Sequence, residues 1–270
     1  MRVLLRARKV RRWYTAAMRT NGIDRKEIFF KALEERLPGS GIETFYYDTL
    51  TSTNDCASAF LKEGIRPPFA VAASSQTAGR GRRGKSFFSP EGGVYCTLAL
   101  PVVSAEDMPL VTVLAATAIR KGITDVTGRE TKIKWVNDLF YEGKKVCGIL
   151  AENLGESMLI GFGIDLVPAE MPPGLETVAG SLNSPADRYA LAGACTGEIM
   201  KLISFLPDRN FLTEYRENCF LIGRSIIFMK NGRQYEAVAE KVEDSGALAV
   251  RLPDGTRMQL TSGEVSVCAK

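Results

Sequence analysis

The sequence contains no histidine among its 270 residues. This absence excludes catalysis by Ser-His-Asp or Cys-His groups, acid–base chemistry by imidazole, and zinc held by histidine. Any chemistry must therefore rest on carboxylates, lysine, arginine, hydroxyl groups and backbone amides.

Cysteine motifs and long apolar runs are also missing. The six cysteines are widely spaced, so no Cys-x-x-Cys pair predicts a zinc or redox site. Scattered thiols without a secretory signal are typical of a reducing cytoplasm, where we expect the protein to be located. The sequence has no uncharged apolar window of about eighteen residues, so we expect no membrane span and no membrane partner.

The composition is that of a soluble globular protein, with 45% apolar and 24% charged residues. The net charge of +4 does not by itself indicate nucleic-acid binding. Six cations nevertheless fall within the first twelve residues. We interpret residues 1–22 as a poorly ordered basic extension, and a nucleic-acid-binding arm is the alternative.

Apolar periodicity predicts two folded parts. Helical spacing predicts helices near residues 23–37, 52–62, 110–119, 189–206 and 211–216. Apolar runs predict strands near 45–47, 69–74, 94–100, 132–136, 146–152 and 158–166, with a turn at 142–144. After residue 221, turn signals separate five short strands. The pattern favours an α+β fold, with a mixed domain at 23–220 and a small all-β barrel or sandwich at 221–270.

A glycine–arginine segment at residues 79–86 matches two phosphate-binding motifs, the dinucleotide fingerprint GxGxxG and the P-loop pattern GxxxxGK[ST]. Both motifs require a helix directly after the loop, but Pro90 and the pair Gly92-Gly93 lead into a strand instead. The segment carries four cations and no acid, so we expect it to be mobile when empty and to bind polyanions. A solvated hairpin turn and an RNA contact are the alternatives.

A second polar cluster surrounds Trp135. Asn137 and Asp138 follow a predicted strand, where their oxygens can hold Mg²⁺ through water, and ordinary turn chemistry is the alternative. Lys145 precedes another strand, and its alternative role is that of an edge lysine that blocks aggregation. Glycines 161 and 163 inside a strand indicate the close approach of a ligand or of backbone.

Taken together, five segments resemble the biotin protein ligase family: Ser52-Thr53-Asn54, GRGRRG at 79–84, KWVND at 134–138, Lys145 with GILAE at 148–152, and IGFGIDL at 160–166. They come in the family's order and at about its spacings, and the similarity extends over about residues 42–268. The resemblance implies a mixed sheet flanked by helices, of the kind found in class II aminoacyl-tRNA synthetases. A small barrel like the Src-homology-3 fold would follow it.

The resemblance also implies an activity. Members of this family join biotin to ATP as biotinyl-5′-adenylate, with Mg²⁺, and then pass biotin to one lysine of a biotin carboxyl carrier domain. The chain before Ser52 is too short for the DNA-binding domain of the repressor-type members, so we expect no sequence-specific DNA binding. We expect a monomer or a homodimer.

The roles that the resemblance implies fall on named residues. Biotin would contact Ser52, Thr53, Asn54, Gln76, Gly79, Arg80, Gly81, Arg82, Lys145, Gly148 and Gly161. ATP would contact Arg80, Arg82, Arg83, Phe87, Asn137 and Lys145. Lys145, Arg82 and Asp138 would be catalytic, and Asn137 with Asp138 would lie near the metal.

Elementary chemistry is consistent with these roles, because joining a carboxylate to a triphosphate brings anions together and requires fixed cations. Three positions depart from the family: Val136 stands in place of a proline, Asp165 in place of an asparagine, and Phe87 in place of a tryptophan. A lipoate–protein ligase, a P-loop nucleotide hydrolase and an RNA-binding module remain as rival functions.

Overall fold

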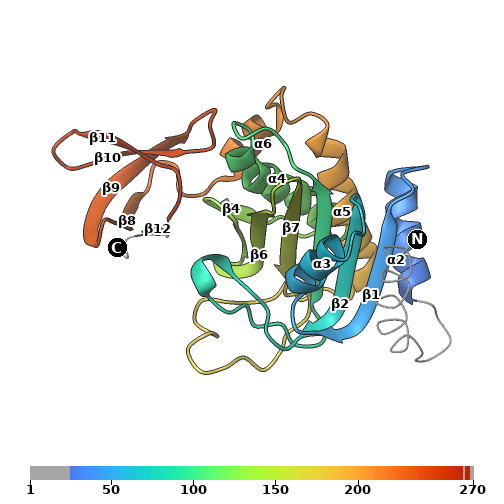
Figure 1. Cartoon of the computed structure of the whole chain (residues 1–270). Helices are drawn as coiled ribbons and strands as arrows, with labels where there is room; N and C mark the ends of the chain where they lie inside the picture. The colour runs from blue at the N-terminus through green and yellow to red at the C-terminus, as the bar shows by residue number, and fades with distance from the viewer. Residues whose placement is uncertain (1–24, 264, 268–270) are drawn as a thin grey trace.

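The computed structural model describes residues 25–263 and 265–267, and its strands form two sheets (Figure 1). The extension predicted at residues 1–22 lies outside the described residues. Within the described part of the chain, no helix is long and apolar enough to cross a membrane.

The larger sheet has seven strands in the order β1-β2-β3-β7-β6-β5-β4. β1 and β2 are parallel and all other neighbours are antiparallel, so the sheet is mixed. This confirms the fold that the resemblance implies. The strands are β1 (Glu43–Leu50), β2 (Phe69–Gln76), β3 (Val94–Pro101), β4 (Lys132–Lys134), β5 (Asp138–Tyr141), β6 (Lys144–Asn153) and β7 (Ser157–Ile164).

Successive side chains of a strand point to opposite sides of the sheet. Both faces of this sheet carry buried apolar side chains, and helices cover both. On β3, Cys96 and Leu98 belong to the large apolar core that α4 and α5 cover, whereas Ala99 packs in a smaller core with α3. We call the second side the α3 face. The helices are α2 (Arg25–Arg36), α3 (Thr53–Lys62), α4 (Met108–Thr127), α5 (Arg188–Ile203) and α6 (Phe211–Asn218).

The smaller sheet projects to one side of the body in Figure 1 and has five antiparallel strands in the order β11-β10-β9-β8-β12. Five strands confirm the number predicted after residue 221. Ile226 and Val250 of this sheet share the large core with α4, so apolar packing is continuous between the sheets. A division into domains at 221 stays a prediction. The strands are β8 (Ser225–Lys230), β9 (Arg233–Val242), β10 (Leu248–Arg251), β11 (Arg257–Leu260) and β12 (Val265–Val267).

The sequence prediction was wrong about one strand. The expected strand at 132–136 ends at Lys134, and the chain reverses before β5, which the prediction lacked. Trp135 and Val136 lie in this reversal and are both buried, and Trp135 Nε1 donates a hydrogen bond to Gly246 O at 2.9 Å. The predicted turn is real, but it joins β5 to β6.

Candidate active site

Two adjoining pockets lie beside the loop at residues 79–87. The polar pocket, about 50 Å³, is lined by the start of α3, the end of β2, the loop 79–87 and the middle of β6 and β7. The cationic pocket, about 260 Å³, is lined by the same loop, the β4–β5 reversal and the end of the smaller sheet. Five residues line both pockets: Gly81, Arg82, Phe87, Asn137 and Lys145.

The first turn of α3 supplies one wall of the polar pocket. Ser52 is the N-cap, and its Oγ accepts a long hydrogen bond from the Asp55 N–H at 3.4 Å. The Thr53 N–H donates to Gln76 Oε1 at 2.8 Å, which ties the helix to the end of β2. Ser52, Thr53 and Asn54 are all buried, so the helix N-terminus presents fixed polar groups to the pocket.

Thr97 of β3 completes this wall from behind. Its hydroxyl lies 2.6 Å from Asn54 Oδ1, to which it donates, and 2.8 Å from Thr53 Oγ1. The side chain is fully buried on the α3 face. The sequence analysis missed Thr97. It could have been found from the alternation of side chains along β3, which places Thr97 on the face opposite to the core residues Cys96 and Leu98.

Glycines form the floor of the polar pocket. A Cβ atom on Gly161 would lie 1.9 Å from Asn54 Oδ1, and Cβ atoms on Gly148 and Gly163 would lie 2.8 and 2.4 Å from the Phe87 ring. The strand glycines therefore mark a close approach by two side chains of the chain itself, Asn54 and Phe87, and not by backbone. The predicted approach of a ligand stays a prediction. Because the Phe87 ring rests on this floor, the polar pocket is narrow.

Gly79 lines neither of the two pockets. A Cβ atom there would lie 2.4 Å from Phe87 O and 2.5 Å from Ser89 Oγ. Gly79 thus allows the two arms of the loop to pack closely, and its predicted contact with biotin stays a prediction.

The loop from residue 79 to 87 is a compact reversal held by its own backbone. The Gly81 N–H donates to Lys85 O at 2.7 Å and the Phe87 N–H to Gly79 O at 2.8 Å. The loop's helical content is one 3-10 turn, Arg82–Gly84, and the chain then runs into β3. Because no α-helix follows the loop, neither the P-loop nor the dinucleotide motif has its required context.

The loop arginines point to different partners. The terminal nitrogens of Arg80 contact the carboxylates of Asp55 and Glu152. Arg82 Nη1 instead donates to Asn137 Oδ1 at 2.9 Å and lies where the two pockets meet.

Lys145 lies at the same junction. Its Nζ is 2.7 Å from Asp138 Oδ1 and 5.7 Å from the centre of the Phe87 ring. The Asp138 carboxylate therefore holds the ammonium group beside Arg82, and the predicted set Lys145, Arg82 and Asp138 comes together around the junction.

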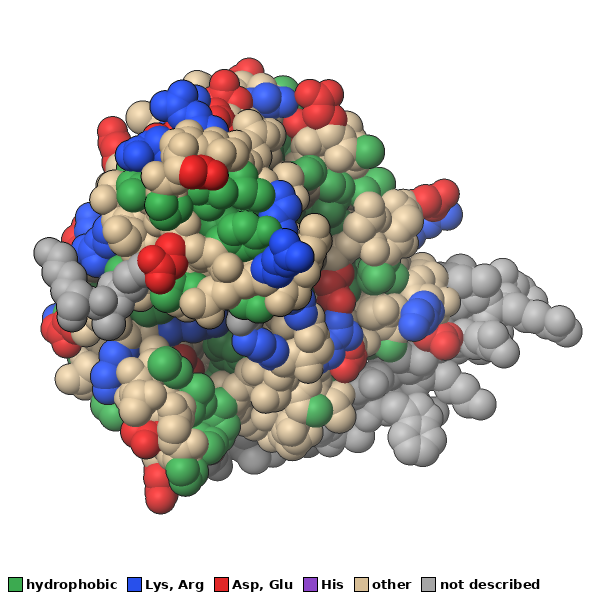
Figure 2. All heavy atoms as spheres, turned by 90° about the vertical axis from the view of Figure 1, so that its left-hand side faces the viewer, with side chains coloured by type: hydrophobic (Ala, Val, Ile, Leu, Met, Phe, Trp, Pro, Cys, Tyr) green, Lys and Arg blue, Asp and Glu red, His purple; other side chains and the backbone are tan. Residues whose placement is uncertain are grey.

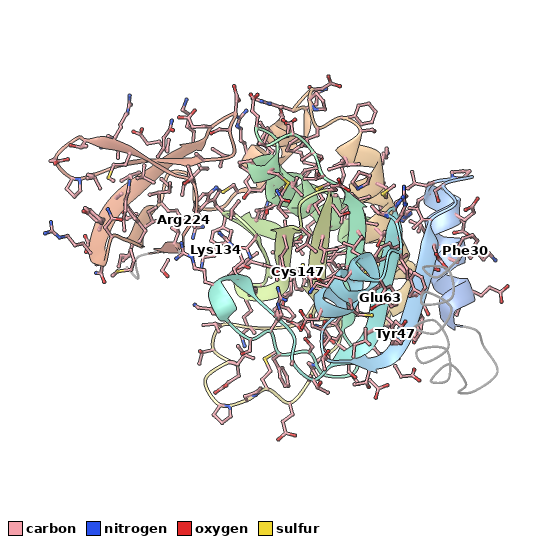
Figure 3. All side chains as sticks on the ribbon, in the orientation of Figure 1. Phe30, Tyr47, Glu63, Lys134, Cys147 and Arg224 are labelled. Carbon is pink, nitrogen blue, oxygen red and sulfur yellow. The ribbon has the colours of Figure 1, made fainter. Side chains whose placement is uncertain are left out.

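The cationic pocket is strongly basic. Five of its lining side chains are cations (Arg82, Arg83, Lys85, Lys134 and Lys145), against one acid, Asp138, among the described residues that line it. Figure 2 shows lysine and arginine side chains bordering the hollow near the middle of the face that carries the smaller sheet. Lys134 lies between the two sheets (Figure 3). Val265 and Ser266 of β12, with Gly263 just before that strand, form the opposite wall.

The pair Asn137 and Asp138 was predicted to lie near a metal. In the structure Asn137 Oδ1 already accepts from Arg82, Asn137 Nδ2 donates to Ile149 O, and Asp138 pairs with Lys145. No group of three or more cysteine, aspartate or glutamate side chains that could hold a metal ion occurs among residues 25–263 and 265–267. These residues alone do not fit a metal cage, and we derive no step through Mg²⁺, so its binding at this pair stays a prediction.

Two family departures lie beside the site. The Trp135–Val136 peptide is cis, and Tyr215 Oη donates to Val136 O at 3.1 Å from α6. Burial raises the pKa of the Asp165 carboxyl to about 7, and the Lys145 charge partly offsets this rise. Asp165 therefore stands out as a carboxyl that burial keeps partly protonated near neutral pH.

Comparisons with known proteins agree with this geometry. Residues 46–165 match the Biotin/lipoate A/B protein ligase family, and residues 221–267 match the Biotin protein ligase C terminal domain. The second match singles out biotin ligases within the broader first family. Together the two matches cover well over half of the chain.

Similar proteins include the "Bifunctional ligase/repressor BirA" of Bacillus subtilis, 35% identical over 185 residues, which are 65% of this chain and 56% of that protein. The chain thus spans about half the length of the Bacillus relatives that it matches. The "Biotin--[acetyl-CoA-carboxylase] ligase" of Paracoccus denitrificans is 29% identical over 80% of this chain and 97% of its own.

Solved structures share the fold. The biotin protein ligase of Aquifex aeolicus, in complex with biotin and ATP, has a TM-score of 0.71 at 22% identity, over 84% of this chain and 99% of that one. The ligase of Leishmania major in complex with biotin has a TM-score of 0.60 at 25% identity, over 82% and 98%. The motifs, the two matched regions and the fold lead to one conclusion: the chain belongs to the biotin protein ligase family.

Proposed function

We propose that this protein activates biotin with ATP and transfers it to a lysine of a biotin carboxyl carrier domain. The observation that carries the proposal is the junction of the two pockets, where Arg82 and Lys145 line both. A polar pocket suits a small neutral head group, and a pocket rich in cations suits a triphosphate. A carboxylate reaching from the first would meet the α-phosphate at the junction.

The first step would form a bond between a biotin carboxylate oxygen and the α-phosphorus of ATP, and the bond from that phosphorus to the β-phosphate oxygen would break. Pyrophosphate leaves. Arg82 and Lys145 offset the repulsion between the two anions and stabilise the charge of the transition state. Asp138 holds the Lys145 ammonium in place through the 2.7 Å ion pair.

The second step would pass biotin to the carrier. The neutral amine of the carrier lysine attacks the acyl carbon, AMP leaves, and the nitrogen loses one proton to give the amide. The second sheet, which we propose as a separate domain from residue 221, walls the cationic pocket and would shield the adenylate from water.

Substrate entry requires Phe87 to move. A volume of about 50 Å³ holds one or two water molecules, far less than a bicyclic acid requires. The ring that rests on Gly148 and Gly163 would leave the pocket floor when biotin enters. Phe87 lines both pockets, so the same movement can bring its ring over the adenine, as the resemblance implies.

The test is a mass measurement on purified protein mixed with ATP, Mg²⁺ and either biotin or lipoate. We expect a tightly held biotinyl-adenylate in the biotin tube only. Lipoyl-adenylate alone would favour the lipoate ligases, and no adenylate in either tube would refute the proposal. Lys85→Ala is the control for the P-loop alternative, which requires that lysine, whereas our proposal assigns the larger loss to Lys145→Ala.

The remaining partner predictions are separate from this test. A monomer or homodimer, a cytoplasmic location and the absence of sequence-specific DNA binding stay predictions. Mass photometry and a gel-shift assay would examine the oligomeric state and DNA binding. The five cysteines in the described part of the chain are buried and unpaired, which agrees with a reducing compartment.

A further inference from the structure

We propose that Glu152 is a positioning residue that sets the direction of the Asn54 side-chain amide and thereby selects a ligand with an N–H donor. The inference rests on the proposed function and concerns a residue to which neither the motifs nor the comparisons assign a role. It acts through Asn54, with no contact to the ligand of its own.

Glu152 lies on the pocket side of the sheet. It follows Gly148 and Leu150 at alternate positions of β6, both of which line the polar pocket. Figure 3 labels Cys147, the neighbour of Gly148 on this strand. Glu152 Oε2 accepts a hydrogen bond from Asn54 Nδ2 at 2.7 Å, and Glu152 Oε1 contacts Arg80 Nη2.

The carboxylate decides which way the Asn54 amide points. An ionised carboxylate only accepts hydrogen bonds, so Asn54 must turn its NH2 group toward Glu152. Asn54 Oδ1 then faces the Thr97 hydroxyl at 2.6 Å and stands over Gly161. A flipped amide would set oxygen against oxygen at Glu152. The fixed orientation leaves an acceptor at the pocket floor, next to the glycine that allows a ligand to approach.

Arg80 and Asp55 keep Glu152 in place. The guanidinium contacts Glu152 with one terminal nitrogen and Asp55 with the other, so it bridges β6 to the first turn of α3. With both terminal nitrogens on carboxylates, Arg80 braces the pocket wall. This assignment differs from the direct anion contact that the resemblance implies for Arg80, and it leaves that task to Arg82 and Lys145.

The ligand class follows from the acceptor. Asn54 Oδ1 already accepts one hydrogen bond from Thr97, and its second lone pair can accept another from a ligand N–H group. An apolar head group cannot supply that second hydrogen bond, so a ligand with an N–H group is favoured. The ureido ring of biotin carries such N–H groups, whereas the dithiolane ring of lipoate does not. Glu152 would thus contribute to the choice between the two acids without touching either.

The experiment is isothermal titration of the whole protein with biotin, and with two biotin analogues methylated on one or the other ureido nitrogen. Glu152→Gln keeps the size of the side chain, but its amide has one oxygen for two donors, so either Asn54 or Arg80 faces an NH2 group. We expect biotin to bind about tenfold to a hundredfold more weakly, and discrimination against at least one methylated analogue to shrink. Glu152→Asp, which keeps a carboxylate, should restore part of the affinity.

Two comparisons separate positioning from a general structural effect. In an Asn54→Ala background, Glu152→Gln should cause no further loss of affinity, because its route to the ligand is gone. Glu156→Gln in the β6–β7 turn makes the same charge change away from the pocket and should bind biotin like wild type. The melting temperatures of all variants, by circular dichroism, show whether each one folds.

The outcomes are distinct. If Glu152→Gln binds biotin like wild type, or weakens binding equally with and without Asn54, the inference is wrong while the proposed function stands. If the wild-type protein binds no biotin, the proposed function is wrong and this inference goes with it.

Discussion

Replacing Asp165 by asparagine should stabilise the protein at pH 8 far more than at pH 4. Burial raises the pKa of this carboxyl from 3.8 to about 7, and the nearby Lys145 charge offsets only part of the rise. In the unfolded chain Asp165 loses its proton near pH 4, but in the folded protein it keeps the proton up to about pH 7. The stability that this group contributes is therefore present below pH 4 and is lost as the pH rises through 7.

The magnitude follows from the two pKa values. A tenfold change in acidity corresponds to about 1.4 kcal/mol, so a rise from 3.8 to about 7 corresponds to at most about 4 kcal/mol. Because the side chain keeps some solvent exposure, we expect about 1–3 kcal/mol. The asparagine side chain would have nearly the same shape as the protonated acid but would not titrate.

The assay is urea unfolding of wild type and Asp165→Asn at pH 4 and pH 8. The informative quantity is the change in their stability difference between the two pH values, since any constant packing effect cancels. The exposed Asp208→Asn serves as the control and should show no such change. A stability difference for Asp165→Asn that is the same at both pH values would refute the reasoning.

Three further substitutions test separate parts of the structure. Lys145→Ala should slow adenylate formation about 10²–10³-fold, because it removes a cation from the junction. The rate is measured by the release of pyrophosphate, and an unchanged rate would contradict the role of Lys145. Gly161→Ala should abolish biotin binding in calorimetry, because its Cβ would lie 1.9 Å from Asn54 Oδ1. Trp135→Phe should lower the free energy of unfolding in urea by about 1–3 kcal/mol, because it leaves the buried Gly246 carbonyl unpaired; equal stability would refute this.

Most helices and strands were predicted because helix caps, turn residues and apolar periodicity all depend on residues that are close together in the sequence. The helix at α3 was predicted from a run of N-cap candidates at residues 51–54, of which Ser52 is the cap in the structure. The five strands after residue 221 were predicted from their turn residues. β5 was missed because the reversal before it depends on distant partners. Trp135 Nε1 donates there to Gly246 O and Tyr215 Oη donates to Val136 O, and neither partner is a neighbour in the sequence.

The side chains of the loop show the same limit. A segment with four cations and no acid predicted an anion site, and the cationic pocket has this character. The sequence did not reveal that Arg80 and Arg82 have different tasks. Arg80 meets Asp55 and Glu152, which are 25 and 72 residues away in the chain, so only the folded sheet brings these acids to it.

The candidate site and the core are specified by one register. Thr97 of β3 pairs with Gly161 of β7, and Gly161 pairs with Leu150 of β6, so one row across three strands carries the rear wall and the floor of the polar pocket. A shift of any of these strands by one residue would turn its pocket side chains into the large core and its core side chains toward α3. The free energy of burying residues such as Leu98 and Ile160 therefore also holds the pocket residues in place, and the packing on one face of the sheet organises the polar site on the other.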